Sequence, residues 1–246
     1  AFDDGELRYS NRFLRTEAYS DAMAGRLTGQ FGTDTRGWRQ VLDTLRSFGL
    51  PDPTDNANVH VARLDGEFVA LTEAPRRVAF DPQTLETRGE FAFDDDDDLT
   101  EHITAAHLVV DPTHDETVGF ATQFGLSPQY HIYRVPAGSR QREVIASLDA
   151  RGPAYIHDCS LTDSHVVLVE SPLTLSVLRA LNPLSEGAID MLEWSPEEPT
   201  RLLVVDRASG ELVADPTFEA TFCFHHVNAY CADGDVVVDL IEFPDS

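Results

Sequence analysis

Short apolar runs separated by turn signals dominate the chain. Seven runs rich in Val, Ile, Leu, Phe and Tyr predict β-strands at residues 58–63, 67–71, 118–123, 130–135, 165–169, 202–205 and 236–241. Asp-Gly pairs at residues 65–66 and 233–234 lie between or just before such runs, and Asp-Pro pairs stand at residues 81–82 and 111–112. These dipeptides favour tight turns, so the pattern predicts successive β-hairpins.

Helical periodicity is sparse. Residues 20–27 and 37–48 are the best helix candidates, and the second has Trp38, Val41, Leu42 and Leu45 at helical spacing. Residues 173–181 are apolar and fit either a helix or a loop. Many short strands with a turn about every 8–12 residues predict an all-β sandwich, barrel or propeller. The loosely repeated order of strand, turn and strand favours propeller blades, and no linker divides residues 1–246, so we predict one domain.

The charge of the chain excludes one class of partner. The 246 residues carry 18 Lys and Arg against 43 Asp and Glu, a formal net charge of −25, and all 18 basic residues are Arg. A surface this negative repels phosphate backbones, which argues against nucleic-acid binding. Dispersed acidity without Lys predicts a halophilic protein, because high salt screens the self-repulsion. The acidic run at residues 94–98 lacks the spacing of a calcium loop and is interpreted as a solvated loop.

Cysteine content and hydropathy indicate the compartment. Cys159, Cys223 and Cys231 form no CxxC pair, so we expect no disulfide framework and a reducing environment. No run approaches the length of a membrane span and no signal peptide is recognisable, which predicts a cytoplasmic protein. Because the chain begins at Ala1 and ends at Ser246 just after a strand-like run, we expect an internal piece of a longer protein.

Three of the nine histidines stand at the edges of apolar strands. His107, His157 and His225 are 50 and 68 residues apart, which excludes a local zinc finger but suits ligands from separate strands. Neutral imidazole is a common ligand of iron, copper and zinc. Three imidazoles without a carboxylate leave the full charge of the ion in an apolar pocket, which suits dioxygen binding beside an apolar substrate. A purely structural role for these histidines is an equally open interpretation. The residues His102, His114, His131 and His165 are interpreted as surface or strand residues.

Seven collinear segments carry a resemblance to a known family. They are "RYSNRFLRTEAY" at residues 8–19, "NANV" at 56–59, "LTEAPRRVAFDPQTLET" at 71–87, "TAAH" with "DP" at 104–112, "ETVGFATQFGLSPQYHIYRV" at 116–135, "YIHDCSLTDSHVVLVESP" at 155–172 and "FCFHHVNAYCADGDVVVDL" at 222–240. Together they resemble the carotenoid cleavage oxygenases, the family that includes the retinoid isomerase of the retinal pigment epithelium.

The resemblance implies a fold and a metal site. It implies a seven-bladed β-propeller with few short helices, of which this chain supplies roughly half and lacks the N- and C-terminal parts. It also implies one non-haem Fe(II) ion held by four histidines, with His107, His157 and His225 in the first three positions and the fourth beyond Ser246. His226 is the alternative to His225. Glu73 is implied to accept a hydrogen bond from a ligand histidine, which we expect to be His157, and Asp158 either orients a ligand or caps a turn.

The resemblance also implies an activity. We expect a dioxygenase that uses dioxygen to cleave a carbon–carbon double bond of a carotenoid or apocarotenoid, giving an aldehyde or ketone, with no catalytic side chain beyond the metal site. Alternatives are a family member that acts on stilbene-type substrates, a non-catalytic propeller that carries carotenoid, and a zinc hydrolase built on three histidines.

A substrate insoluble in water implies contact with a membrane. The apolar residues of the segment at 172–184 resemble a stretch that lies at the mouth of the substrate tunnel in the family, so we expect peripheral membrane association through Leu173, Leu175, Val177, Leu178 and Leu181. The alternative is a buried helix that packs on the propeller.

Overall fold

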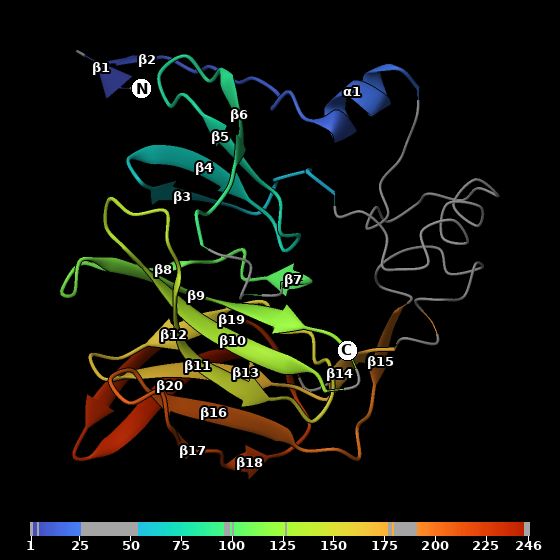
Figure 1. Cartoon of the computed structure of the whole chain (residues 1–246), viewed down its shortest axis with the longest axis vertical. Helices are drawn as coiled ribbons and strands as arrows, with labels where there is room; N and C mark the ends of the chain where they lie inside the picture. The colour runs from blue at the N-terminus through green and yellow to red at the C-terminus, as the bar shows by residue number, and fades with distance from the viewer. Residues whose placement is uncertain are drawn as a thin grey trace.

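The described residues of the computed structural model form a nearly all-β architecture (Figure 1). These residues are 2–3, 5–25, 54–95, 99, 101–125, 127–176, 179 and 191–243. Antiparallel sheets follow one another along the chain, and Figure 1 shows the cyan first sheet above the green strands of the second, with the orange strands β16, β17 and β18 lowest. This arrangement confirms the predicted all-β class.

Three sheets of four or five strands account for most of the structure. The first has the order β3 (His60–Leu64), β4 (Glu67–Leu71), β5 (Arg77–Phe80) and β6 (Thr87–Phe91). The second contains β7 (Ile103–Thr104), β8 (Val109–Asp111), β9 (Glu116–Gln123), β10 (Gln129–Pro136) and β11 (Glu143–Asp149). The third contains β12 (Cys159–Leu161), β13 (His165–Glu170), β16 (Thr200–Asp206), β17 (Leu212–Ala214) and β18 (Thr217–Phe218).

Three two-stranded sheets complete the described part. The long hairpin of β19 (Phe222–Ala232) and β20 (Asp235–Phe243) follows the third sheet. The short pair of β14 (Leu173–Leu175) and β15 (Leu192–Trp194) leaves the third sheet between β13 and β16, and β1 (Phe2–Asp3) pairs with β2 (Glu6–Leu7). Six of the seven predicted strand runs lie within strands, namely β4, β9, β10, β13, β16 and β20, and the run predicted at 58–63 overlaps β3, which begins two residues later.

Two Asp-Gly turns have the backbone that tight hairpins require. Asp65 and Gly66 join β3 to β4 with φ values of 45° and 75°, and Asp233 and Gly234 join β19 to β20 with φ values of 53° and 90°. Two consecutive positive φ angles match the right-handed twist of the strands that they connect. Asp and Gly tolerate this conformation, so the local sequence fixes where both hairpins turn.

The core lies between the sheets. Its largest fully buried side chains come from strands of successive sheets and include Phe91, Phe120, Tyr130, Ile132, Tyr133, Leu168 and Leu203. Burying side chains of this size stabilises the fold by about 1.5–3 kcal/mol each. The core therefore packs these sheets against one another and fixes their relative positions.

Buried ion clusters link neighbouring sheets. Between the second and third sheets, Arg207 Nη2 lies 2.5 Å from Asp111 Oδ2 and 2.6 Å from Glu116 Oε1. Between the first and second sheets, Arg77 and Arg142 both contact Glu101 at 2.7 Å. Guanidinium groups suit such sites because their fixed fork of donors satisfies two carboxylate oxygens at once.

One helix is found among the described residues. α1 (Glu17–Met23) begins after Thr16, whose side chain accepts a hydrogen bond from Tyr19 N. The predicted helix at residues 20–27 is therefore correct in kind but starts too late, because the Thr16 cap sets the beginning. The predicted helix at 37–48 lies outside the described residues. No helix in the described ranges has the length and apolar character to cross a bilayer.

Candidate metal centre

Each of the three candidate histidines lies where the first strand of a sheet is interrupted or begins. His107 lies between β7 and β8, which both pair with β9. His157 lies just before β12, and His225 lies in β19 where the register with β20 shifts between Cys223 and His226. An irregular strand turns its side chains away from the regular alternation. The three side chains can therefore converge although they belong to three sheets.

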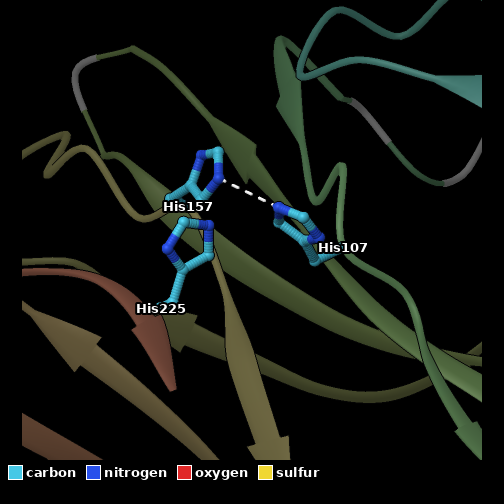
Figure 2. A group of neighbouring side chains, drawn as sticks. All are labelled: His107, His157 and His225. Atoms are coloured by element: carbon cyan, nitrogen blue, oxygen red, sulfur yellow. Dashed lines mark hydrogen bonds between the residues drawn. The ribbon is translucent and has the colours of Figure 1, made fainter. Parts of the chain in front are cut away.

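The three imidazoles meet in one place (Figure 2). One nitrogen from each ring lies within 4.8 Å of the others, and the Nε2 atoms of His107 and His157 are 3.1 Å apart. The ring centroids of the three pairs are separated by 4.8 to 5.2 Å. Metal–nitrogen bonds of about 2.0–2.1 Å place two ligand nitrogens about 3–4 Å apart, so the 3.1 Å separation of His107 and His157 fits a single transition-metal ion, and a nitrogen of His225 lies close to this pair.

Glu73 fixes the orientation of His157. Nδ1 of His157 lies 2.6 Å from Glu73 Oε1, and the hydroxyl of Tyr155 donates to the same oxygen at 2.6 Å. Because a carboxylate only accepts, the ring proton of His157 resides on Nδ1 and the lone pair of Nε2 points into the cluster. This is the contact that the sequence predicts for Glu73.

Burial favours a neutral ring at His107, and aromatic side chains lie beside His157. Burial, with a smaller contribution from His157, lowers the pKa of His107, so this imidazole is neutral near pH 7. The rings of Tyr155 and Phe224 lie 6.3 and 5.5 Å from that of His157. His157 is buried, His107 is half-buried and His225 is exposed. The cluster is thus lined by apolar rings on one side and accessible on the side of His225.

The structure distinguishes the contacts of His225 from those of His226. His225 joins the cluster, whereas Nδ1 of His226 lies 2.9 Å from Ser160 Oγ. Burial lowers the pKa of His226 to about 4, which keeps this ring neutral and bound to the hydroxyl. Of the two adjacent histidines, only His225 is placed to share an ion with His107 and His157.

The remaining histidines have other neighbours. His131 lies between Ser147 and Gln123, His114 pairs with Asp111, His102 accepts from the backbone N–H of Phe124, and His165 contacts Ser164. None of these four belongs to the cluster, as the sequence predicts. His60 was not predicted to lie near the cluster, yet its half-buried ring has its centroid 5.2 Å from that of His107. Its nearness to His107 arises from the packing of two sheets, so no local sequence pattern could have singled it out.

The segment expected to face a membrane begins inside the fold. Leu173 is only 7% exposed, because β14 pairs with β15 and the carbonyl of Leu173 accepts from Tyr155 N. The expectation that Leu173 faces lipid is therefore wrong. Leu175 is half-buried, and Val177, Leu178 and Leu181 lie outside the described residues.

The match to a family model decides the relationship. The model of the retinal pigment epithelial membrane protein family matches residues 1–246, the whole sequence. The chain belongs to this family. Carotenoid cleavage dioxygenase 8 of Arabidopsis thaliana is 32% identical over 94% of this chain and 42% of its own length. The human beta,beta-carotene 15,15'-dioxygenase is 27% identical over 99% of this chain and 49% of its own length.

Solved structures of the family share the fold. The cobalt-substituted apocarotenoid oxygenase of Synechocystis has a TM-score of 0.77 and 26% identity over 96% of this chain and 49% of that chain. This family member therefore has the propeller architecture of that enzyme over the matched part. The chain spans about half the length of the relatives that it matches.

The residues present fit a divalent transition-metal ion. Imidazole nitrogens are donors that such ions favour, and the bond between Glu73 and His157 is the kind of outer contact that usually accompanies a metal-bound histidine. Together with the 4.8 Å limit on the spacing of the three nitrogens, these features make His107, His157 and His225 the candidate ligand set.

Proposed function

We propose that this protein is a non-haem Fe(II)-dependent dioxygenase that cleaves a carbon–carbon double bond of a carotenoid or apocarotenoid to give aldehyde or ketone products. The observation that carries the proposal is the convergence of His107, His157 and His225, with Glu73 holding the ring of His157. The names of the related dioxygenases support the substrate class. The complete active protein would extend beyond the part of its relatives that this chain matches.

The chain's own residues would prepare the site. The three imidazoles would present lone pairs to one Fe(II) ion, which supplies the place where dioxygen binds and is activated. Glu73 would keep the proton of His157 on Nδ1, so that Nε2 stays free to bind. The rings of Tyr155 and Phe224, which lie 6.3 Å apart and pack on the buried ring of Phe222, would offer an apolar surface to a polyene and exclude water.

Glu73 does not suit the role of a hydrolytic base. Its Oε1 oxygen already accepts hydrogen bonds from His157 and Tyr155 at 2.6 Å. A zinc hydrolase would need a carboxylate free to take a proton from water at the open position of the metal. With Oε1 engaged by His157 and Tyr155, Glu73 is better suited to positioning the ring of His157 than to activating a water molecule.

The test is turnover of the full-length protein loaded with Fe(II). A β-apocarotenal is offered under ¹⁸O-labelled dioxygen, and products are identified by chromatography and mass spectrometry. We expect a labelled aldehyde or ketone product, and loss of both bound iron and product in His107→Ala, His157→Ala and His225→Ala. His165→Ala is the matched control, because this histidine lies outside the cluster.

Other outcomes would identify the alternatives. Tight binding of the polyene without a product, in a protein that contains iron, would indicate a carrier. Cleavage of a stilbene in preference to the apocarotenal would change the substrate class. Iron content that is unchanged in all three histidine variants would refute the metal centre itself.

We also propose that the protein meets its substrate at the surface of a membrane in the cytoplasm of a halophilic cell. The apolar composition of the segment that continues from β14 supports peripheral contact, and the acidity without Lys supports the halophilic origin. Because Leu173 is buried, the lipid contact is assigned to Leu175, Val177, Leu178 and Leu181. Tests of both points are given in the Discussion.

A further inference from the structure

One carboxylate connects two of the segments that carry the clustered histidines. Asp158 directly follows His157, and its Oδ1 accepts from the backbone N–H of Cys159 at 2.8 Å. Its Oδ2 accepts from the backbone N–H of His226 at 3.1 Å. His226 directly follows His225, so Asp158 bonds to the backbone of both histidine-bearing segments, 68 residues apart in the sequence.

A second contact reinforces the first. Ser160 Oγ lies 2.9 Å from Nδ1 of His226, on the same pair of segments. Within the described residues β12 pairs with β13 and β19 pairs with β20, and no backbone pairing joins β12 to β19. Side chains from the His157 segment therefore replace the missing backbone pairing between the two sheets.

The position of His225 depends on this connection. The register between β19 and β20 passes from Cys223 opposite Glu242 to His226 opposite Leu240, so His225 lies in an irregular stretch of strand. Its side chain is exposed, and its ring lies beside the rings of His107, His157 and Phe224. Few contacts hold the His225 ring in place, so its position depends on what fixes the backbone of the following residue, His226.

We propose that Asp158 and Ser160 form a clasp that positions His225 relative to His157, and that this clasp sets the geometry and affinity of the metal centre. The inference rests on the proposed metal-binding function. An aspartate that only capped a turn would need no more than the bond to Cys159. The bond from Oδ2 to the other segment is what a positioning role requires.

The charge of Asp158 offers a competing explanation. A negative carboxylate near the cluster would also favour a bound cation through space, without holding any backbone in place. Asp158→Asn separates the two effects, because asparagine removes the charge but keeps one carbonyl oxygen that accepts one of the two backbone hydrogen bonds. Asp158→Ala removes both bonds and the charge.

The experiment is titration of the full-length protein with Co(II), followed by visible absorption, which reports both affinity and coordination geometry. We expect Asp158→Ala to weaken Co(II) binding about 10–100-fold, as is typical when an outer partner of a metal ligand is lost, and to alter the absorption bands. Asp158→Asn should give an intermediate loss, and Ser160→Ala a smaller one. Asp163→Ala is the control, because Asp163 is exposed on the same segment.

Each outcome has a separate meaning. A folded Asp158→Ala protein with the affinity and spectrum of the wild type would overturn the clasp. Equal losses in Asp158→Asn and Asp158→Ala, together with wild-type affinity and spectrum in Ser160→Ala, would overturn it in favour of the charge. If Asp158→Ala does not fold, Asp158→Asn and Ser160→Ala decide, and unchanged spectra in both refute the proposal. Failure of the wild type to bind Co(II) would instead refute the proposed metal centre.

Discussion

Replacing Glu73 with glutamine should weaken metal binding about tenfold. In the wild type, Glu73 Oε1 accepts from His157 Nδ1 and from the Tyr155 hydroxyl, each at 2.6 Å. Glutamine is nearly the same size and keeps one carbonyl oxygen, but it has lost the negative charge. The Glu73→Gln variant therefore tests the strength of these bonds without opening a cavity.

The magnitude follows from the kind of hydrogen bond. A bond to a charged group contributes about 1.5–3 kcal/mol and a neutral one about 0.5–1.5 kcal/mol, so the change costs about 1–2 kcal/mol. The Glu73 side chain is 26% exposed, and solvent weakens the contribution of the charge. We therefore take the lower part of this range, which corresponds to about 5–10-fold in the dissociation constant of the metal.

The assay is Co(II) titration of the full-length protein, with Glu211→Gln as the control because Glu211 is exposed just before β17. A Glu73→Gln protein that binds Co(II) as tightly as the wild type would refute the reasoning. So would an equal loss in the Glu211→Gln control, because the effect would then reflect overall charge.

Three further predictions concern acid, salt and lipid. Burial alone would raise the pKa of Asp111, but hydrogen bonds from Arg207, His114 and the backbone outweigh it and lower this pKa to about 2. The resulting stabilisation, about 2 kcal/mol, is present above the ordinary pKa and disappears as pH falls through about 2. Asp111→Asn should therefore lower the melting temperature at pH 7 and not at pH 2. An equal difference in melting temperature between the variant and the wild type at pH 7 and at pH 2 would contradict this. The melting temperature of the wild type should rise from ~0.1 M to multimolar KCl, since salt screens a net charge of −25, and a flat curve would argue against halophilic adaptation. Full-length protein carrying Leu175→Asp and Leu178→Asp should pellet less with liposomes at high salt than the wild type, because each Leu loses about 1.5–3 kcal/mol of burial in lipid. Equal pelleting of a folded double variant would assign the segment to the core.

Strands with apolar runs were predictable, and polar or short strands were not. β4 lies at the predicted residues, and β9 and β10 extend the predicted runs by one or two residues at their ends. β6 (Thr87–Phe91) was missed because most of its side chains are exposed and polar. β11 (Glu143–Asp149) was missed because only alternate residues are buried, which leaves a weak apolar signal.

The candidate site, like the strands, could be predicted only in part from the sequence. Motif resemblance selected His107, His157 and Glu73, and the structure brings them together. The choice between His225 and His226 could not be made from periodicity, because an irregular strand breaks the alternation that the argument would use. The nearness of His60 to His107 depends on how two sheets pack, which no local pattern encodes.

The interrupted strands that hold the three imidazoles have a consequence for how the protein matures. An ion bound there would connect His107, His157 and His225, which are separated by 50 and 68 positions in the sequence. It would therefore act as a removable cross-link between three sheets. The unfolded chain holds no such pocket, and the second sheet, the third sheet and the β19–β20 hairpin must assemble before all three rings can bind. Metal loading is then a late step, and we expect the ion to slow unfolding more than it speeds refolding. Hydrogen exchange should show the gain in protection at all three strand interruptions together.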